Sequence, residues 1–199
     1  MRVRMIAVSL ALAASSVAAT AQMATGANAG PAAGTIVAPS KAVDSHLSLI
    51  EMEMMGAVKA MPADKFGFAP SAAIFAPGQA TEFATVRTFA QQATHVAQGN
   101  YFFYTTVAGI KPDVDVAGIA KLTKKDDVVA ALAASFVFAH KAIATLTAAN
   151  AFEVVTIPEP GFYTKATLAE FGVSHAFDHY GQMVEYLRMN GLVPPASAK

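Results

Sequence analysis

Two histidines near the C-terminal end carry the clearest chemical signal. His175 and His179 are four residues apart, so on a helix they lie one above the other on the same face. A helical wheel places both in the apolar stripe of Leu168, Met183 and Tyr186. A buried imidazole needs a polar partner, since an unpaired polar group in apolar surroundings is costly. A shared divalent cation would be such a partner, and so would hydrogen bonds to backbone or tyrosine; the spacing leaves both readings open.

The residues around this pair refine the possibilities. Ala176 stands where a zinc protease motif would have glutamate, so that motif is absent. Gly172, one turn before His175, is expected to leave room beside the ring. Asp178 points about a quarter turn away from His179 and is expected to be solvated; the alternative is that it supports a metal ligand through a hydrogen bond.

The remaining histidines are ambiguous or unremarkable by position. His95 falls in the middle of a predicted helix but off the centre of its apolar stripe, among Gln91, Gln92 and Gln98. Its position therefore fits a surface histidine as well as a ligand. His140 lies at the edge of an apolar stripe, which favours packing or hydrogen bonding, and His46 lies in a first helical turn, which favours exposure.

The composition limits what such a site can be made of. There is no cysteine among the 199 residues, which excludes disulfides, a thiolate nucleophile and a Cys-ligated zinc site. Hydrophobic residues make up 54% of the chain and the formal net charge is zero. A disordered polar chain and a basic nucleic-acid binder are both excluded.

The N-terminus reads as an export signal. A short cationic start is followed by an apolar run, and Ala19-Thr20-Ala21 forms a signal peptidase site before Gln22. Residues 1–21 are therefore predicted to be a signal peptide, and 22–40, rich in Ala, Gly, Pro and Ser, a flexible lead-in. The expectation is an exported protein, periplasmic or secreted, without a stable membrane anchor after cleavage.

Four helical blocks are expected to position the histidines. Apolar residues at helical spacing predict helices over 43–61, 82–108, 123–149 and 164–190. Thr123, with Asp126 three residues later, is expected to cap the third helix, and Gly191 to end the fourth. Four long amphipathic helices predict an all-α four-helix bundle over 41–195. The long connections 63–81 and 109–122 leave room for at least one crossover.

The last helix also resembles a known family. Residues 172–195 read Gly-Val-Ser-His-Ala-Phe-Asp-His-Tyr-Gly-Gln-Met-Val-Glu-Tyr-Leu-Arg-Met-Asn-Gly-Leu-Val-Pro-Pro. This is similar to the C-terminal signature of DinB-like proteins, H-x-x-x-H-Y-G-Q followed by Y-L-R, a glycine and Pro-Pro. Segments 61–70, 89–103 and 131–136 resemble the family's corresponding parts, so the resemblance covers about 43–195. The sequence departs from the pattern at Gln92, where the family usually has an apolar residue, and in a longer stretch at 71–81.

The resemblance implies a DinB-like bundle with a crossover and a metal held by His95, His175 and His179. Such a site keeps open coordination positions, as catalytic sites do, and imidazole ligands suit zinc or nickel. It implies a metal-dependent hydrolase or transferase of an unknown small molecule, or alternatively a non-catalytic metal- or ligand-binding module of the cell envelope. Whether the chain is an enzyme stays open, and a homodimer is compatible with either reading.

Two further expectations concern the chemistry. Some relatives transfer small cytosolic thiols, which are scarce outside the cytoplasm, so an exported member is not expected to use them. Candidate general bases are Glu51, Glu53 and Asp178, none with a strong placement.

Overall fold

The computed structural model describes residues 30–71, 74, 76–80, 82, 85–158 and 160–198. The predicted signal peptide and residues 22–29 of the predicted lead-in lie outside this range. Residues 30–35 belong to a first unit and contain a turn closed by the Thr35 N–H on the Ala32 carbonyl. The second unit, Ile36–Lys199, holds the helices. Its first helix begins at Pro39, four residues before the expected start, since proline is pre-organised for the first helical position.

The architecture is all-α, as expected, with four long helices and a few short elements. The long helices are α1 Pro39–Ala60, α2 Phe89–Ala108, α4 Lys125–Ile143 and α5 Lys165–Met189. The short elements are the 3-10 turns Ala63–Lys65 and Pro195–Ser197, the single-turn helix α3 Val116–Ile119, and the strands β1 Val154–Val155 and β2 Tyr163–Thr164. The two strands pair antiparallel, Val154 with Thr164 and Val155 with Tyr163. This small hairpin was not predicted.

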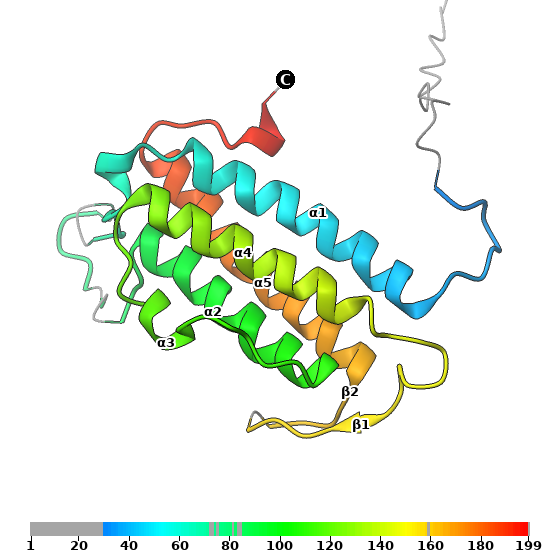
Figure 1. Cartoon of the computed structure of the whole chain (residues 1–199). Coiled ribbons are helices and arrows are strands. Elements are labelled where there is room, and N and C mark those ends of the chain that lie inside the picture. Colours follow the sequence, from blue (N-terminus) through cyan, green and yellow to red (C-terminus); the bar gives the residue numbers. More distant parts are fainter. Residues whose placement is uncertain are drawn as a thin grey trace, which may run out of the picture. The chain divides into compact units, whose positions relative to one another are not determined.

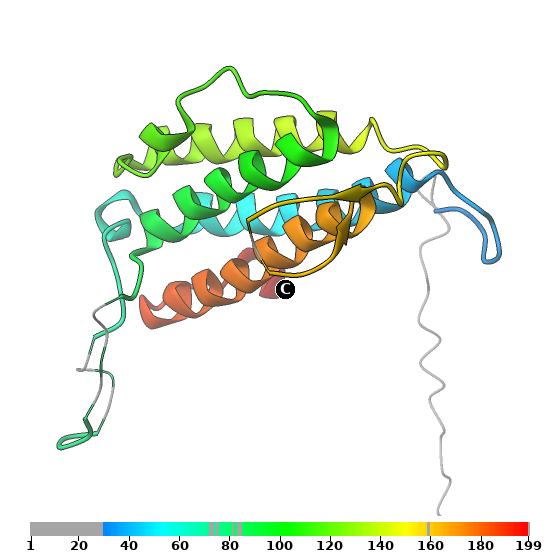
Figure 2. The same cartoon turned by 90° about the horizontal axis from the view of Figure 1, so that it is seen from below.

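The four long helices form a bundle in which α1 and α2 each pack against both α4 and α5. The colours in Figures 1 and 2 show that α1 and α5 run in one direction and α2 and α4 in the other. Because α2 and the next long helix, α4, are neighbours that run the same way, the connection between them returns along the length of the bundle. This is the predicted crossover, and α3 lies on it.

Local capping explains where the helices that carry the histidines begin. Thr88 and Gln91 form a capping box at the start of α2, so the helix starts at Phe89 and not at the expected residue 82. Thr164 caps α5 in the same way through Thr167. Gly191 follows α5 with φ +74°, the left-handed conformation predicted for it.

The third long helix corrects the expectation at both ends. Thr123 does not cap it; α4 begins at Lys125, and the Lys125 ammonium donates to the carbonyls of Lys59 and Met61 at the end of α1, at 2.7 and 2.8 Å. The helix ends at Ile143 instead of about 149. Beyond it, the side chain of Asn150 accepts from the backbone N–H of Thr147, which stabilises a turn.

The core is built from the predicted apolar stripes. The residues of the α1 stripe are fully buried, as are those of α4 and α5 that share their spacing: Leu47, Ile50, Met54, Val58, Val128, Leu132, Phe136, Leu168 and Met183. In the aromatic run of α2, Tyr101, Phe103 and Tyr104 are buried, whereas Phe102 is 41% exposed. One ring of that run therefore faces solvent. No helix in the described part of the chain is long and apolar enough to span a membrane.

Candidate metal centre

Three histidines from two antiparallel helices converge on one point. His95 of α2 and His175 and His179 of α5 each offer a ring nitrogen, and these atoms lie within 4.8 Å of one another. The ring centroids are 4.6 to 5.0 Å apart. His179 is buried, and the other two are partly exposed. The structure thus brings together the three residues that the family resemblance indicated.

The donor set fits a divalent cation. The Nε2 atoms of His95 and His175 are 3.1 Å apart. Two imidazole nitrogens at about 2.0–2.1 Å from one ion, at angles between octahedral and tetrahedral, would be separated by about 2.9–3.4 Å. The Nδ1 atom of His175 is buried without a hydrogen-bond partner. Neutral nitrogens gathered at this separation are what a three-imidazole cation site requires.

Gly99, and not Gly172, makes room for His175. A Cβ atom on Gly99 would lie 2.7 Å from Cε1 and 3.1 Å from Nδ1 of His175. A Cβ on Gly172 would instead lie 2.9 Å from the hydroxyl oxygen of Tyr104, which donates to the Ala169 carbonyl. The expectation that Gly172 leaves room for His175 is therefore wrong; Gly172 leaves room for Tyr104. The glycine that admits the imidazole lies on the opposite helix, α2.

A chain of amide groups fixes the orientation of His179. The Asp178 carboxylate accepts from Gln182 Nε2 at 3.2 Å, and Gln182 Oε1 accepts from Gln92 Nε2 at 2.7 Å. The carbonyl of Gln92 is then left to accept from His179 Nδ1, at 2.6 Å. Because a carboxylate can only accept at its end of the chain, His179 carries its proton on Nδ1. Its Nε2 keeps a lone pair for a ligand, the arrangement typical of metal-binding histidines.

The electrostatics of the site keep the imidazoles neutral. Burial, the positive charge of Arg87 and the neighbouring His179 lower the pKa of His95 to about 4. Burial and the two neighbouring histidines lower the pKa of His175 to about 4 as well. Burial also lowers the pKa of His179, although Asp178 opposes it. Neutral imidazoles can act as metal ligands, whereas imidazolium cannot.

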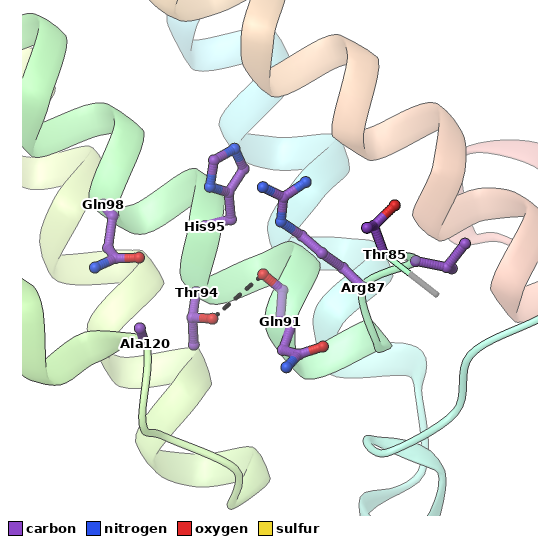
Figure 3. A pocket seen from close by; sticks show the side chains of 8 residues that line it. Thr85, Arg87, Gln91, Thr94, His95, Gln98 and Ala120 are labelled. Carbon is purple, nitrogen blue, oxygen red and sulfur yellow. Dashed lines mark hydrogen bonds between the residues drawn. The ribbon is translucent and has the colours of Figure 1, made fainter. Parts of the chain in front are cut away.

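Two clefts open beside the histidines and share His95 and Gln98. A polar cleft of about 380 Å³ is lined by Arg87, Gln91, Thr94 and others. Figure 3 shows the Arg87 guanidinium and the His95 ring directed to the same side of it. A second cleft of about 560 Å³ is mostly apolar and is lined by Phe102, Phe103, Val116, Phe171 and His175. The crossover connection contributes to both, through Ala120 to the polar cleft and Val116 to the apolar one.

The other histidines and the candidate bases make different contacts. His140 of α4 is hydrogen-bonded between Asp44 and Glu51 of α1, as its edge position suggested. This contact engages Glu51 with His140. His46 is exposed and lies 3.2 Å from a carboxylate oxygen of Glu170.

The two other candidate bases also make no direct contact with the three rings. Glu53 lies near Tyr180, whose pKa is raised by burial and then by the charge of Glu53. Asp178 is exposed, as expected, and reaches His179 only through the two glutamines.

Three residues of the site escaped the sequence reasoning. Gln92 was visible as a departure from the family pattern, and that departure was the signal of a polar role. Arg87 fell inside the range 82–108 that was expected to be helical, and nothing in the pattern marked it; the helix begins only at Phe89. Gly99 lay in an apolar helix where a glycine is unfavourable, which itself suggests a close approach.

Comparison with known families agrees with this reading of the fold. The model of the DinB superfamily matches residues 46–183, well over half of the chain. A crossover four-helix bundle with three clustered histidines is thus the class of protein, and the chain belongs to the DinB superfamily. Among curated proteins, none matches it.

Proposed function

We propose that this DinB-superfamily protein binds one divalent metal ion, zinc or nickel, through His95, His175 and His179, and uses it as a hydrolase or transferase of a small organic molecule. The observation that carries the proposal is the convergence of three ring nitrogens within 4.8 Å beside two clefts. A purely structural metal would be expected in a closed site, whereas catalytic sites keep a position open.

The chain's own residues supply the surroundings that such chemistry needs. A bound divalent ion would polarise a substrate oxygen or lower the pKa of bound water. Gln92 holds the tautomer of His179 that leaves Nε2 free. Arg87 places a positive charge beside the histidine triad, that is His95, His175 and His179. There it can stabilise a developing negative charge.

A second candidate, a non-catalytic metal- or ligand-binding module, is favoured by one observation. Within the described residues, no carboxylate or tyrosine hydroxyl is hydrogen-bonded to the three rings. Tyr104 donates to the Ala169 carbonyl and Tyr186 to the Arg87 carbonyl. A protein of this kind would bind the metal and its ligand but turn nothing over.

Metal analysis of the purified protein tests the common part of both candidates. We expect about one equivalent of metal per chain, and His179→Ala should lose tight binding while keeping the helical far-ultraviolet spectrum. His46→Ala removes an exposed histidine from α1 and serves as the control, with unchanged metal content. Loss of metal in the control but not in His179→Ala would overturn the site. A screen of ester, amide and phosphoester turnover by the loaded protein then separates the two candidates.

We also propose that the protein is exported, with cleavage between Ala21 and Gln22. The support is the cationic start, the apolar run and the small residues at 19 and 21. Mass spectrometry of protein recovered from its native host gives the mature N-terminus. An intact first residue on the mature protein would contradict the proposal.

A further inference from the structure

We propose that the ligand of this site is an amphipathic anion, with an oxyanion head group on Arg87 and an apolar body against Phe102 and Phe171. This inference rests on the proposed function in one respect, since it places the ligand across the same three histidines. The observations that carry it concern the residues of the two clefts other than the metal ligands, although His95 lines both clefts and His175 lines the apolar one.

Arg87 is exposed, and its guanidinium is accessible to an anion. The ion pairs of the described residues all lie elsewhere, at His46, His140, Lys165 and Arg188. Its backbone is fixed, because the buried Tyr186 hydroxyl donates to the Arg87 carbonyl at 3.1 Å. The guanidinium and the ring of His95 line the same cleft and are directed to the same side of it (Figure 3). A planar guanidinium matches a carboxylate or phosphate through two parallel hydrogen bonds.

The second cleft supplies a surface for an apolar body. Phe102 and Phe171 are 41% and 39% exposed, although large aromatic side chains are usually well buried. Phe103 lies between them in edge-to-face contact with both, with centroids 5.2 Å apart in each case, and also contacts His175 at 5.3 Å. Exposed rings that continue directly from a polar site indicate a binding surface for an apolar group.

The geometry of α2 connects the two surfaces. Gln91, His95, Gln98 and Phe102 are spaced four, three and four residues apart, so they lie along one face of the helix. From His95 to Phe102 is seven residues, or about 10 Å of helix rise. His95 and Gln98 line both clefts. A ligand that fills both therefore passes the triad between its head group and its apolar end.

Binding of defined probes tests the inference without relying on turnover. The main probe is 6-phenylhexanoate, titrated calorimetrically into the metal-free and the zinc-loaded protein. Hexanoate lacks the ring, 6-phenylhexan-1-ol lacks the charge, and 6-phenylhexyl phosphate replaces the carboxylate by a phosphate. We expect the carboxylate or the phosphate with the phenyl group to bind most tightly, and the comparison of these two probes identifies the head group.

The variants separate the two parts of the site. Arg87→Gln should weaken the preferred anionic probe about tenfold or more, the size of a hydrogen bond to a charged group. Phe102→Ser and Phe171→Ser should each weaken it several-fold. Arg188→Gln removes the same charge from an exposed pair with Glu185 and should leave binding unchanged. None of these variants should change the metal content.

Two results would overturn the inference: equal binding by wild type and Arg87→Gln, or equal binding of the alcohol and both anions. If the protein holds no metal but still binds the probe through Arg87, the proposed metal function fails while the anion site stands. If metal is bound normally and the anions show no preference, only the inference fails.

Discussion

Two clusters in this bundle are centred on histidines, and the hydrogen-bond partners of these histidines differ in charge. His95, His175 and His179 lie between α2 and α5, where their partners are one another and the neutral carbonyl of Gln92. His140 lies between α4 and α1, where both ring nitrogens face carboxylates, Asp44 at 2.5 Å and Glu51 at 2.9 Å. The residue type is the same, but the partners differ in charge.

This difference decides what each cluster can do. Burial would lower the pKa of His140, but the hydrogen bonds and charges of Asp44 and Glu51 raise it overall. A ring that donates from both nitrogens is an imidazolium, which ties two helices together but cannot bind a metal. The triad has lowered pKa values and free lone pairs. The hydrogen-bond partners of an imidazole, more than its burial, therefore decide whether it can bind a metal. His140, paired with Asp44 and Glu51, instead forms a clamp that joins α4 to α1.

The largest loss of metal affinity is expected from removing Gln92, the neutral hydrogen-bond partner of His179. Gln92→Leu keeps a similar volume but deletes the acceptor for His179 Nδ1. We expect metal affinity to fall about 10- to 100-fold, the range typical for outer-shell partners, as measured by competition with a chelating dye. Gln182→Leu breaks the chain one link further away and should have a smaller effect. Unchanged affinity in Gln92→Leu would show that the amide chain does not position His179.

A somewhat smaller effect is expected from filling the space beside His175. Gly99→Ala places a Cβ atom 2.7 Å from His175 Cε1, so the ring must shift. Metal affinity should fall by about tenfold, because a displaced ligand no longer meets the distance that imidazole requires.

Gly181→Ala is the matched control for this substitution. It lies in α5 with nothing within 4 Å of the added Cβ. It should leave the metal affinity unchanged and stabilise the helix by about 0.5–1 kcal/mol. Equal metal affinities in the two alanine variants would contradict the close approach at Gly99.

In the metal-free protein, the triad and His140 should titrate at different pH values. NMR titration of the ring protons should give His95 and His175 pKa values of about 4, and His140 a value above 6.5. Between about pH 6.5 and 4 the unfolded chain binds more protons at the two triad histidines than the folded chain does. Their contribution therefore lowers stability as pH falls through that window. A common value near 6.5 for the three residues would remove the distinction.

His140 should act with the opposite sign, and its effect is smaller. Its folded pKa is raised, so its stabilisation is present below about pH 6.5 and is lost as pH rises through that raised value. The Asp44 side chain is 45% exposed, so solvent screens the pair. At pH 6, His140→Gln should therefore lower the free energy of unfolding by only about 0.5–1 kcal/mol in urea denaturation, and less at pH 9.

His46→Gln is the control for this clamp, since its single contact with Glu170 joins two side chains that are nearly half exposed. It should cost only a few tenths of a kcal/mol. Metal content should be unchanged in both variants. A loss of metal on replacing His140 would mean that the clamp and the triad are coupled.

Local pattern was enough to predict much of the framework. The i, i+4 spacing of His175 and His179 placed both rings on the inner face of α5, and the apolar stripes of α1, α4 and α5 are the core. Such features depend only on positions along one helix, where periodicity fixes the direction of a side chain. The same reasoning found the left-handed Gly191.

Only the tertiary structure decided how the site is completed. A helical wheel gives directions around one axis and does not say which neighbouring helix lies opposite, so the position of His95 fitted a surface residue as well as a ligand. The antiparallel approach of α2 and α5 brings it to the other two rings. The same approach makes Gly99 the glycine that admits His175 and buries Gln92 against His179. Sequence supplied the ligand types and their spacing on each helix; contact between helices supplied the convergence, because it depends on packing distances that no single helix encodes.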